Sequence, residues 1–211
     1  MLRLVVFDMD GVLIDACEWH KNALNESLLE ISNYKISEED HIAHYNGLPT
    51  KVKLDKMVEL GHISRQSVKE IYFSKQEKTK EIIRSQACVD ESKIRLMEWL
   101  RDQGIYIACF TNSIHETAHM MLSKTGVMDF LELLVTNQDV NNPKPNPEGY
   151  YKALKHFDVY SSETMIVEDS PKGIQAALAT GCKVMQVENA TKVNIKNVKE
   201  FIDENFDSHG G

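Results

Sequence analysis

The sequence predicts a doubly wound α/β fold with a parallel sheet and one inserted helical segment. Several short apolar runs end abruptly in polar residues, as strands buried on both faces of a sheet do. Helical patterns separate these runs from residue 91 onward, and strands that alternate with helices imply right-handed crossovers between parallel strands. The interval from residue 16 to residue 86 breaks this alternation, because it carries helical periodicity only.

Five apolar runs are the expected strands. Residues 2–7 form the first, a near-continuous run of strand-forming residues that stops at Asp8. The fifth run is shorter and more mixed than the others. After the first run, the expected strands cover residues 105–110, 131–135, 164–167 and 183–187.

The helices between the later strands have recognisable ends. A polar residue that can cap a helix precedes each one, and a glycine follows each one at the position after the C-cap. The candidate N-caps are Asp90, Ser113 and Ser170, and Pro171 follows the last of these. The expected helices cover residues 91–101, 114–124 and 172–180, followed by Gly104, Gly126 and Gly181.

The inserted segment reads as a separate helical subdomain. Apolar residues recur at helical spacing, for example Leu24 and Leu28 or Met57 and Leu60, and turns are expected near Asn33 and at Gly61. We therefore predict an α/β core domain made of residues 1–15 and 87–211, interrupted by a helical domain over residues 16–86.

Composition narrows the class of protein. The chain of 211 residues has 24 Lys and Arg against 32 Asp and Glu. This net charge of -8 is opposite in sign to the positive charge typical of proteins that bind nucleic acids. The four cysteines show no metal or disulfide spacing, and no apolar run is long enough to cross a membrane. We expect a cytoplasmic monomer that acts on a small molecule, binds neither nucleic acid nor membrane, and ends in a frayed tail at 208–211.

Polar residues that can do chemistry follow four of the expected strands. Ligands of open α/β sheets bind beyond the carboxyl ends of the strands, so these residues should share one site. Several carboxylates together require a cation, and hard oxygen ligands favour Mg²⁺. A hydroxyl, helix N-terminal amides and a lysine can hold phosphoryl oxygens, so a carboxylate beside them can attack phosphorus. The residues are Asp8, Asp10, Thr111, Asn112, Lys144, Glu168 and Asp169.

These segments resemble the haloacid dehalogenase superfamily, whose four motifs occur here in order across nearly the whole chain. The motifs read Asp-Met-Asp-Gly-Val-Leu-Ile-Asp over 8–15, Phe-Thr-Asn-Ser over 110–113, Lys-Pro at 144–145 and Glu-Asp-Ser-Pro-Lys-Gly over 168–173. Each short motif is weak alone, but the set at these spacings is specific. The helical insertion resembles the α-helical cap of the subfamily that contains β-phosphoglucomutase, phosphoglycolate phosphatase and many sugar-phosphate phosphatases.

The resemblance implies a role for each motif residue. Asp8 would be the nucleophile and Asp10 the general acid and base, with the Asp10 backbone carbonyl also on Mg²⁺. Asp169 would complete the metal site with Glu168 close behind it. The phosphoryl group would be bound by Thr111, Asn112 and Lys144. The implied activity is a Mg²⁺-dependent phosphatase acting on a small phosphorylated metabolite, such as a sugar phosphate, through an aspartyl-phosphate.

A phosphosugar mutase of the β-phosphoglucomutase type is the nearest alternative, because it forms the same intermediate. Compared with that pattern, a threonine is replaced by Ala16, and a lysine and an arginine by Asn46 and Thr50, although Lys51 is adjacent to the second change. This favours water as the phosphoryl acceptor. The substrate residues expected in the cap are His20, Gly47, Lys51 and Lys75.

Two further classes are compatible with parts of the sequence. Residues 115–119 match the H-E-x-x-H pattern of zinc peptidases on an expected helix, with Asp139 as a distant third ligand, but Glu116 can also pair with Ser113 in a capping box. A receiver-like phospho-acceptor domain uses similar residues in another order, without a helical insertion and without an acid two residues after the nucleophile.

Overall fold

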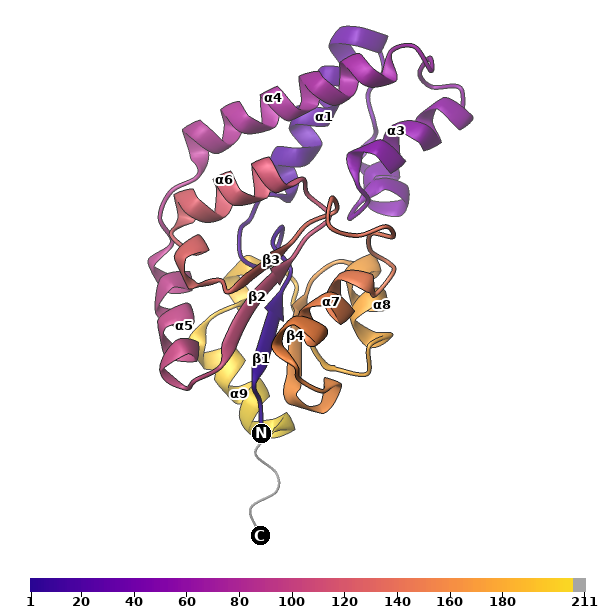
Figure 1. The fold of residues 1–211 in the computed structure, drawn as a ribbon. Helices are drawn as coiled ribbons and strands as arrows, with labels where there is room; N and C mark the ends of the chain where they lie inside the picture. The colour runs from indigo at the N-terminus through magenta and orange to yellow at the C-terminus, as the bar shows by residue number, and fades with distance from the viewer. Residues whose placement is uncertain (207–211) are drawn as a thin grey trace. The chain divides into compact units, whose positions relative to one another are not determined.

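Five parallel strands form one sheet in the order β3-β2-β1-β4-β5, which confirms the predicted α/β fold (Figure 1). The structure is a computed structural model that describes residues 1–206, so the expected tail at 208–211 lies outside it. The strands are β1 (Leu4–Phe7), β2 (Tyr106–Phe110), β3 (Leu133–Val135), β4 (Thr164–Glu168) and β5 (Lys183–Gln186).

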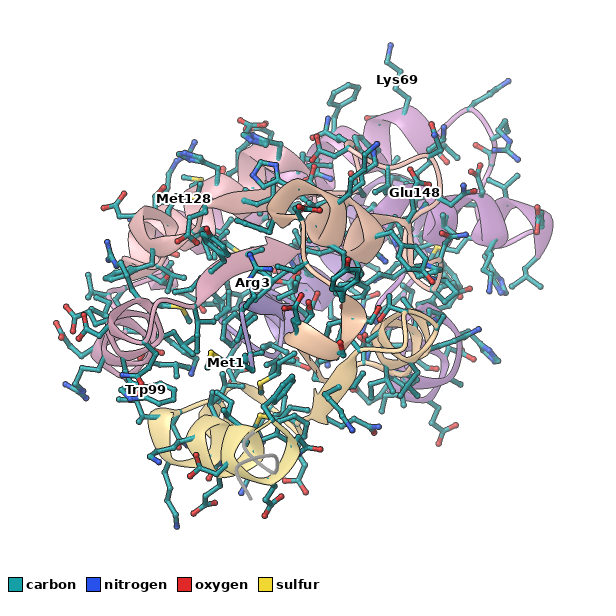
Figure 2. All side chains as sticks on the ribbon, turned by 60° about the horizontal axis from the view of Figure 1, so that its bottom comes forward. Met1, Arg3, Lys69, Trp99, Met128 and Glu148 are labelled. Atoms are coloured by element: carbon teal, nitrogen blue, oxygen red, sulfur yellow. The ribbon has the colours of Figure 1, made fainter. Side chains whose placement is uncertain are left out.

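The central strand aligns the polar residues that follow its neighbours. Phe7 on β1 is level with Cys109 on β2 and with Val167 on β4. All four residues of β1 are buried, as expected for a strand covered on both faces. The strands run parallel, so the residues just beyond Phe7, Cys109 and Val167 come together at one edge of the sheet. Arg3 lies at the opposite edge, which faces the viewer in Figure 2.

Helices cover both faces of this sheet. Figure 1 shows α5, α6 and α9 on one face and α7 and α8 on the other. The sequence identified three of these helices but neither α7 nor α9. Their bounds are α5 (Glu91–Asp102), α6 (His115–Thr125), α7 (Glu148–Phe157), α8 (Pro171–Leu178) and α9 (Ile195–Asn205), with short 3-10 turns at Met128–Phe130, Ser161–Glu163 and Ala190–Lys192.

Two of the three expected N-caps are confirmed. Asp90 accepts hydrogen bonds from the N–H groups of Ser92 and Lys93, and Ser170 accepts one from Gly173 N–H. The expectation for Ser113 was wrong: α6 begins at His115, so the N-cap is Ile114 and not Ser113.

The chain divides into two compact units, Met1–Asp15 with Cys88–Gly211 and Ala16–Ala87. The second unit contains α1 (Cys17–Ser32), α2 (Glu38–Asp40), a π-helical turn (His41–Tyr45), α3 (Thr50–Glu59) and α4 (Val68–Gln86). Helix α1 packs on α4. The core of this unit is formed by Leu24, Leu28, Ile36, Tyr45, Leu54, Met57, Ile63 and Ile71. Within residues 1–206, no helix has the length and apolar character needed to cross a bilayer.

Candidate active site

Lys144 connects two carboxylates at the carboxyl edge of the sheet. Its Nζ donates hydrogen bonds to Asp8 Oδ1 at 2.6 Å, to Glu168 Oε1 at 2.5 Å and to the backbone carbonyl of Phe110 at 2.7 Å. Only 3% of Lys144 is exposed. The ammonium group is therefore held next to Asp8 with little access to solvent.

Asn112 holds the loop that carries Lys144. The backbone N–H of Lys144 donates to Asn112 Oδ1 at 3.1 Å, and Asn112 Nδ2 donates to the backbone carbonyl of Lys144 at 3.3 Å. The side chain expected to bind phosphate thus also ties the second motif to the third. Thr111, which precedes it, is buried, and its Oγ1 accepts a hydrogen bond from Ser113 N–H at 3.0 Å.

Glu168 is completely buried and surrounded by donors. Besides Lys144, the hydroxyl of Tyr150 donates to Glu168 Oε1 at 2.6 Å, and the N–H of Asp169 donates to Oε2 at 3.2 Å. The carboxylate lies against the first turn of α8, where a Cβ on Gly173 would be 2.1 Å from either oxygen. Tyr150 was not among the residues expected at the site, although its spacing from Ala153 and Leu154 on one buried helix face was a detectable signal.

The geometry around Asp169 fits a divalent cation. Asp8, Glu168 and Asp169 can each offer a ligand atom within 4.8 Å of the others. Asp169 Oδ1 is buried without a hydrogen-bond partner, which is costly unless another ligand satisfies it. A Cβ on Gly11, which has φ +90°, would lie 2.1 Å from Asp169 Oδ2, so only glycine leaves room for this carboxylate.

The charges at this site are unbalanced without a cation. Burial raises the pKa of Asp8 well above its ordinary value, and Glu168 and Asp169 raise it further while Lys144 opposes them. Burial, followed by Glu168, raises the pKa of Asp169 to about 7. Burial lowers the pKa of Lys144, but the two carboxylates it contacts outweigh that effect and raise it. Three carboxylates face one ammonium, so added positive charge would stabilise their ionised forms.

Asp10 lies two residues after Asp8 and contacts Ser113, which was expected to cap the following helix. Ser113 Oγ donates a hydrogen bond to Asp10 Oδ2 at 3.1 Å. At the N-terminus of α6, the N–H of His115 instead donates a hydrogen bond to Gln138 Oε1 at 2.7 Å. The contact of Ser113 with Asp10 joins the second motif to the first.

The residues expected to bind substrate in the cap lie within the helical unit. Lys75 lies on α4 and is only 5% exposed. Its Nζ is 3.0 Å from Nδ1 of His20, which lies on α1. Gly47 has φ +72° in the turn before α3, and Lys51 is exposed on α3.

The H-E-x-x-H segment does not gather metal ligands. His115 and His119 are exposed on α6, with their rings stacked at 5.9 Å. In residues 1–206, the one group of three or more potential ligands is Asp8, Glu168 and Asp169.

Comparison with known proteins assigns the family. The sequence model of the haloacid dehalogenase-like hydrolases matches residues 5–187. The chain is 26% identical to validoxylamine A 7'-phosphate phosphatase of Streptomyces hygroscopicus subsp. limoneus, over 86% of this chain and 83% of that protein. It is also 26% identical to the phosphorylated carbohydrates phosphatase of Thermotoga maritima, over 85% and 82% of the two chains.

Solved structures share the fold. The β-phosphoglucomutase of Clostridium difficile has a TM-score of 0.82 and 18% identity, and the match covers 97% of this chain and 98% of that one. CbbY from Rhodobacter sphaeroides, in complex with phosphate, has a TM-score of 0.79 and 20% identity, over 88% and 86% of the two chains. The phosphatase relatives support a hydrolase that acts on phosphate esters, and the match over residues 5–187 shows that this chain belongs to the haloacid dehalogenase-like hydrolase family.

Proposed function

We propose that the protein is a Mg²⁺-dependent phosphatase that hydrolyses a small phosphate monoester, such as a sugar phosphate, through an aspartyl-phosphate on Asp8. The observation that carries this proposal is the buried contact of Asp8 with Lys144, inside a carboxylate cluster that fits a cation. The names of two relatives, phosphatases of a phosphorylated carbohydrate and of validoxylamine A 7'-phosphate, support the substrate class.

The metal would be held by the side chains of Asp8 and Asp169 and by the backbone carbonyl of Asp10. Glu168 belongs to the same cluster, but its oxygens already accept hydrogen bonds from Lys144, Tyr150 and Asp169 N–H. We therefore assign Glu168 mainly the role of fixing Lys144 and adding charge near the metal. When bound, Mg²⁺ supplies positive charge that keeps the carboxylates ionised and withdraws electrons from the phosphoryl oxygens.

In the first step, an oxygen of Asp8 attacks phosphorus while Lys144 and Thr111 bind the phosphoryl oxygens, together with the backbone N–H of Asn112. The bond between phosphorus and the ester oxygen breaks, and the electron pair stays on that oxygen. Asp10 transfers its proton to the departing oxygen, so the products are an alcohol and the aspartyl-phosphate.

In the second step, Asp10 accepts a proton from water as the water oxygen attacks phosphorus. The bond between phosphorus and the Asp8 oxygen breaks, which releases inorganic phosphate and restores the Asp8 carboxylate. The proton on Asp10 is thereby restored for the next substrate.

Two variants and a substrate panel test the proposal. Asp8→Asn should abolish Mg²⁺-dependent release of phosphate, because loss of a covalent nucleophile costs orders of magnitude in rate. Asp10→Asn should slow esters with poor leaving groups most and spare aryl phosphates. An Asp8→Asn protein that keeps more than about a tenth of the wild-type rate would show that Asp8 is not the nucleophile.

A mutase would start with the same step, so the products must be followed separately. β-Glucose 1-phosphate, offered with a trace of its bisphosphate, should yield inorganic phosphate faster than glucose 6-phosphate. The reverse order would replace the phosphatase proposal by the mutase. The roles of His20, Gly47, Lys51 and Lys75 stay predictions, and alanine variants of His20 and Lys75 test them through the ranking of the substrate panel.

A further inference from the structure

We infer that Ser113 is a positioning residue for Asp10, and that it directs the Asp10 proton to the leaving group of unactivated alkyl phosphates. The inference rests on the proposed function and extends it. Its basis is the hydrogen bond from Ser113 Oγ to Asp10 Oδ2, at 3.1 Å, between residues 103 positions apart in the chain. Both side chains are half-buried, so this contact is partly shielded from water.

The backbone of Ser113 is fixed on both sides. Its N–H donates to Thr111 Oγ1 at 3.0 Å, and its carbonyl accepts a hydrogen bond from Asn137 N–H at 3.2 Å. The side chain of Asn137 also donates to the carbonyl of Asn112 at 2.8 Å. The loop after β3 thus holds the loop after β2, which leaves rotation about one side-chain bond as the main freedom of the Ser113 hydroxyl.

The backbone of Asp10 is fixed as well. Gly11 N–H donates to the carbonyl of Ile14 at 2.7 Å, and an isolated bridge joins Asp10 to Ile14. The N–H groups of Leu13 and Ile14 both donate to the carbonyl of Met9, at 2.9 Å each. The backbone around Asp10 therefore forms a closed turn, and the contact with Ser113 selects one orientation of the carboxyl group.

This orientation has a chemical consequence. A carboxyl oxygen that accepts a hydrogen bond from Ser113 is a poor place for the acidic proton, so the proton is directed to the other oxygen, Oδ1. As the ester bond breaks, Asp10 gives up that proton and becomes charged, and a hydrogen bond to a charged acceptor is stronger than one to a neutral acceptor. Loss of the Ser113 hydroxyl should therefore slow the reaction most for esters whose leaving groups depend on proton transfer from Asp10.

The experiment compares Ser113→Ala, Ser113→Thr and Ser123→Ala on two substrates, p-nitrophenyl phosphate and the alkyl phosphate that the wild type cleaves fastest. Ser123 is the control serine, because it lies on α6, the helix that follows the Ser113 loop, and its hydroxyl contacts His119 Nδ1 and not Asp10. Ser113→Ala should lower kcat for the alkyl ester about tenfold and change kcat for the aryl ester less than about twofold, with KM unchanged. Ser113→Thr should restore most of the alkyl rate, and Ser123→Ala should match the wild type.

A double-mutant cycle separates positioning from general damage. In an Asp10→Asn background, Ser113→Ala should cause no further loss on either substrate, because Ser113 acts through Asp10. Equal losses on both substrates, or the same tenfold loss in the Asp10→Asn background, would overturn the inference. The inference would also be overturned if the wild type cleaves aryl phosphates only. The proposed function itself still stands if wild-type activity requires Asp8, and it fails together with this inference if the wild type cleaves neither substrate.

Discussion

Replacing Lys144 with methionine should destabilise the metal-free protein strongly. The variant keeps an apolar side chain of similar length but removes the ammonium that contacts Asp8 at 2.6 Å and Glu168 at 2.5 Å. Breaking a buried ion pair by removing one partner typically costs about 3–5 kcal/mol, because the other charge stays buried and uncompensated. For a protein of this size, that loss corresponds to a fall in Tm of about 10 °C.

Lys93→Met is the matched control. Lys93 and Lys144 are each 3% exposed, but Lys93 Nζ donates to the carbonyl of Ala190 at 2.7 Å and its carboxylate neighbour, Asp90, is 4.0 Å away. Its replacement should therefore cost about 1–2 kcal/mol, the penalty for an unpaired polar group.

Thermal unfolding of the wild type and both variants at pH 7.5, with EDTA or with saturating Mg²⁺, measures the loss of stability that each substitution causes. Mg²⁺ should restore part of the stability lost in Lys144→Met but not in Lys93→Met, because the cation supplies positive charge at the carboxylate cluster. Lowering the pH to about 5.5 should also reduce the Lys144→Met loss, since the carboxylates whose pKa values are raised become protonated. A Lys144→Met loss below about 1 kcal/mol, or one that responds to neither Mg²⁺ nor pH, would refute this reasoning.

Three more outcomes follow from the same site. Asp169 has a pKa raised to about 7 and must be ionised to bind a cation, so the apparent Kd for Mg²⁺, measured by calorimetry, should rise by up to about tenfold per pH unit below 7 and stay constant above it. A Kd that is flat from pH 8 to 5.5 would contradict this. Tyr150→Phe should lower kcat about five- to tenfold, because it removes a hydrogen-bond donor to Glu168. The control is Tyr151→Phe, which should leave kcat unchanged, because the Tyr151 hydroxyl contacts the carbonyl of Ala179 instead. Equal kinetics for the two variants would refute the role of Tyr150. His119→Ala should keep activity and metal dependence within a few-fold of wild type, and stoichiometric zinc that disappears in this variant would show the contrary.

The sequence allowed the sheet to be predicted because its strands are buried on both faces. A run such as residues 4–7 has no polar position to interrupt it, so its limits are visible without tertiary information. The residues just beyond such strands belong at one edge, which is why Asp8 and Glu168 could be placed in one site although 160 positions separate them. The order of the strands has no such local signal, because it depends on which way each crossover turns.

The errors concern residues whose partners are distant in sequence. Ser113 followed three positions later by Glu116 matches a capping box, and the local pattern contains no sign of a competing acceptor at Asp10. Tyr150 on α7 was missed for a similar reason, since its hydroxyl donates a hydrogen bond to Glu168, at the end of β4. A local pattern shows what a residue can do, whereas the fold decides which of its possible partners it meets.

The position of β1 in the middle of the sheet also has a consequence for synthesis on the ribosome. Phe7 is made well before its sheet partners, Cys109 and Val167. The helical unit, in contrast, is complete once Ala87 has been made, so its contacts can form while most of the α/β unit is still missing. One edge of β1 has no partner until β4 emerges, and the carboxylate cluster has no Asp169 before that point. Between the synthesis of β1 and that of β4, the nascent chain thus carries an apolar strand with one unpaired edge, and the site is not yet complete.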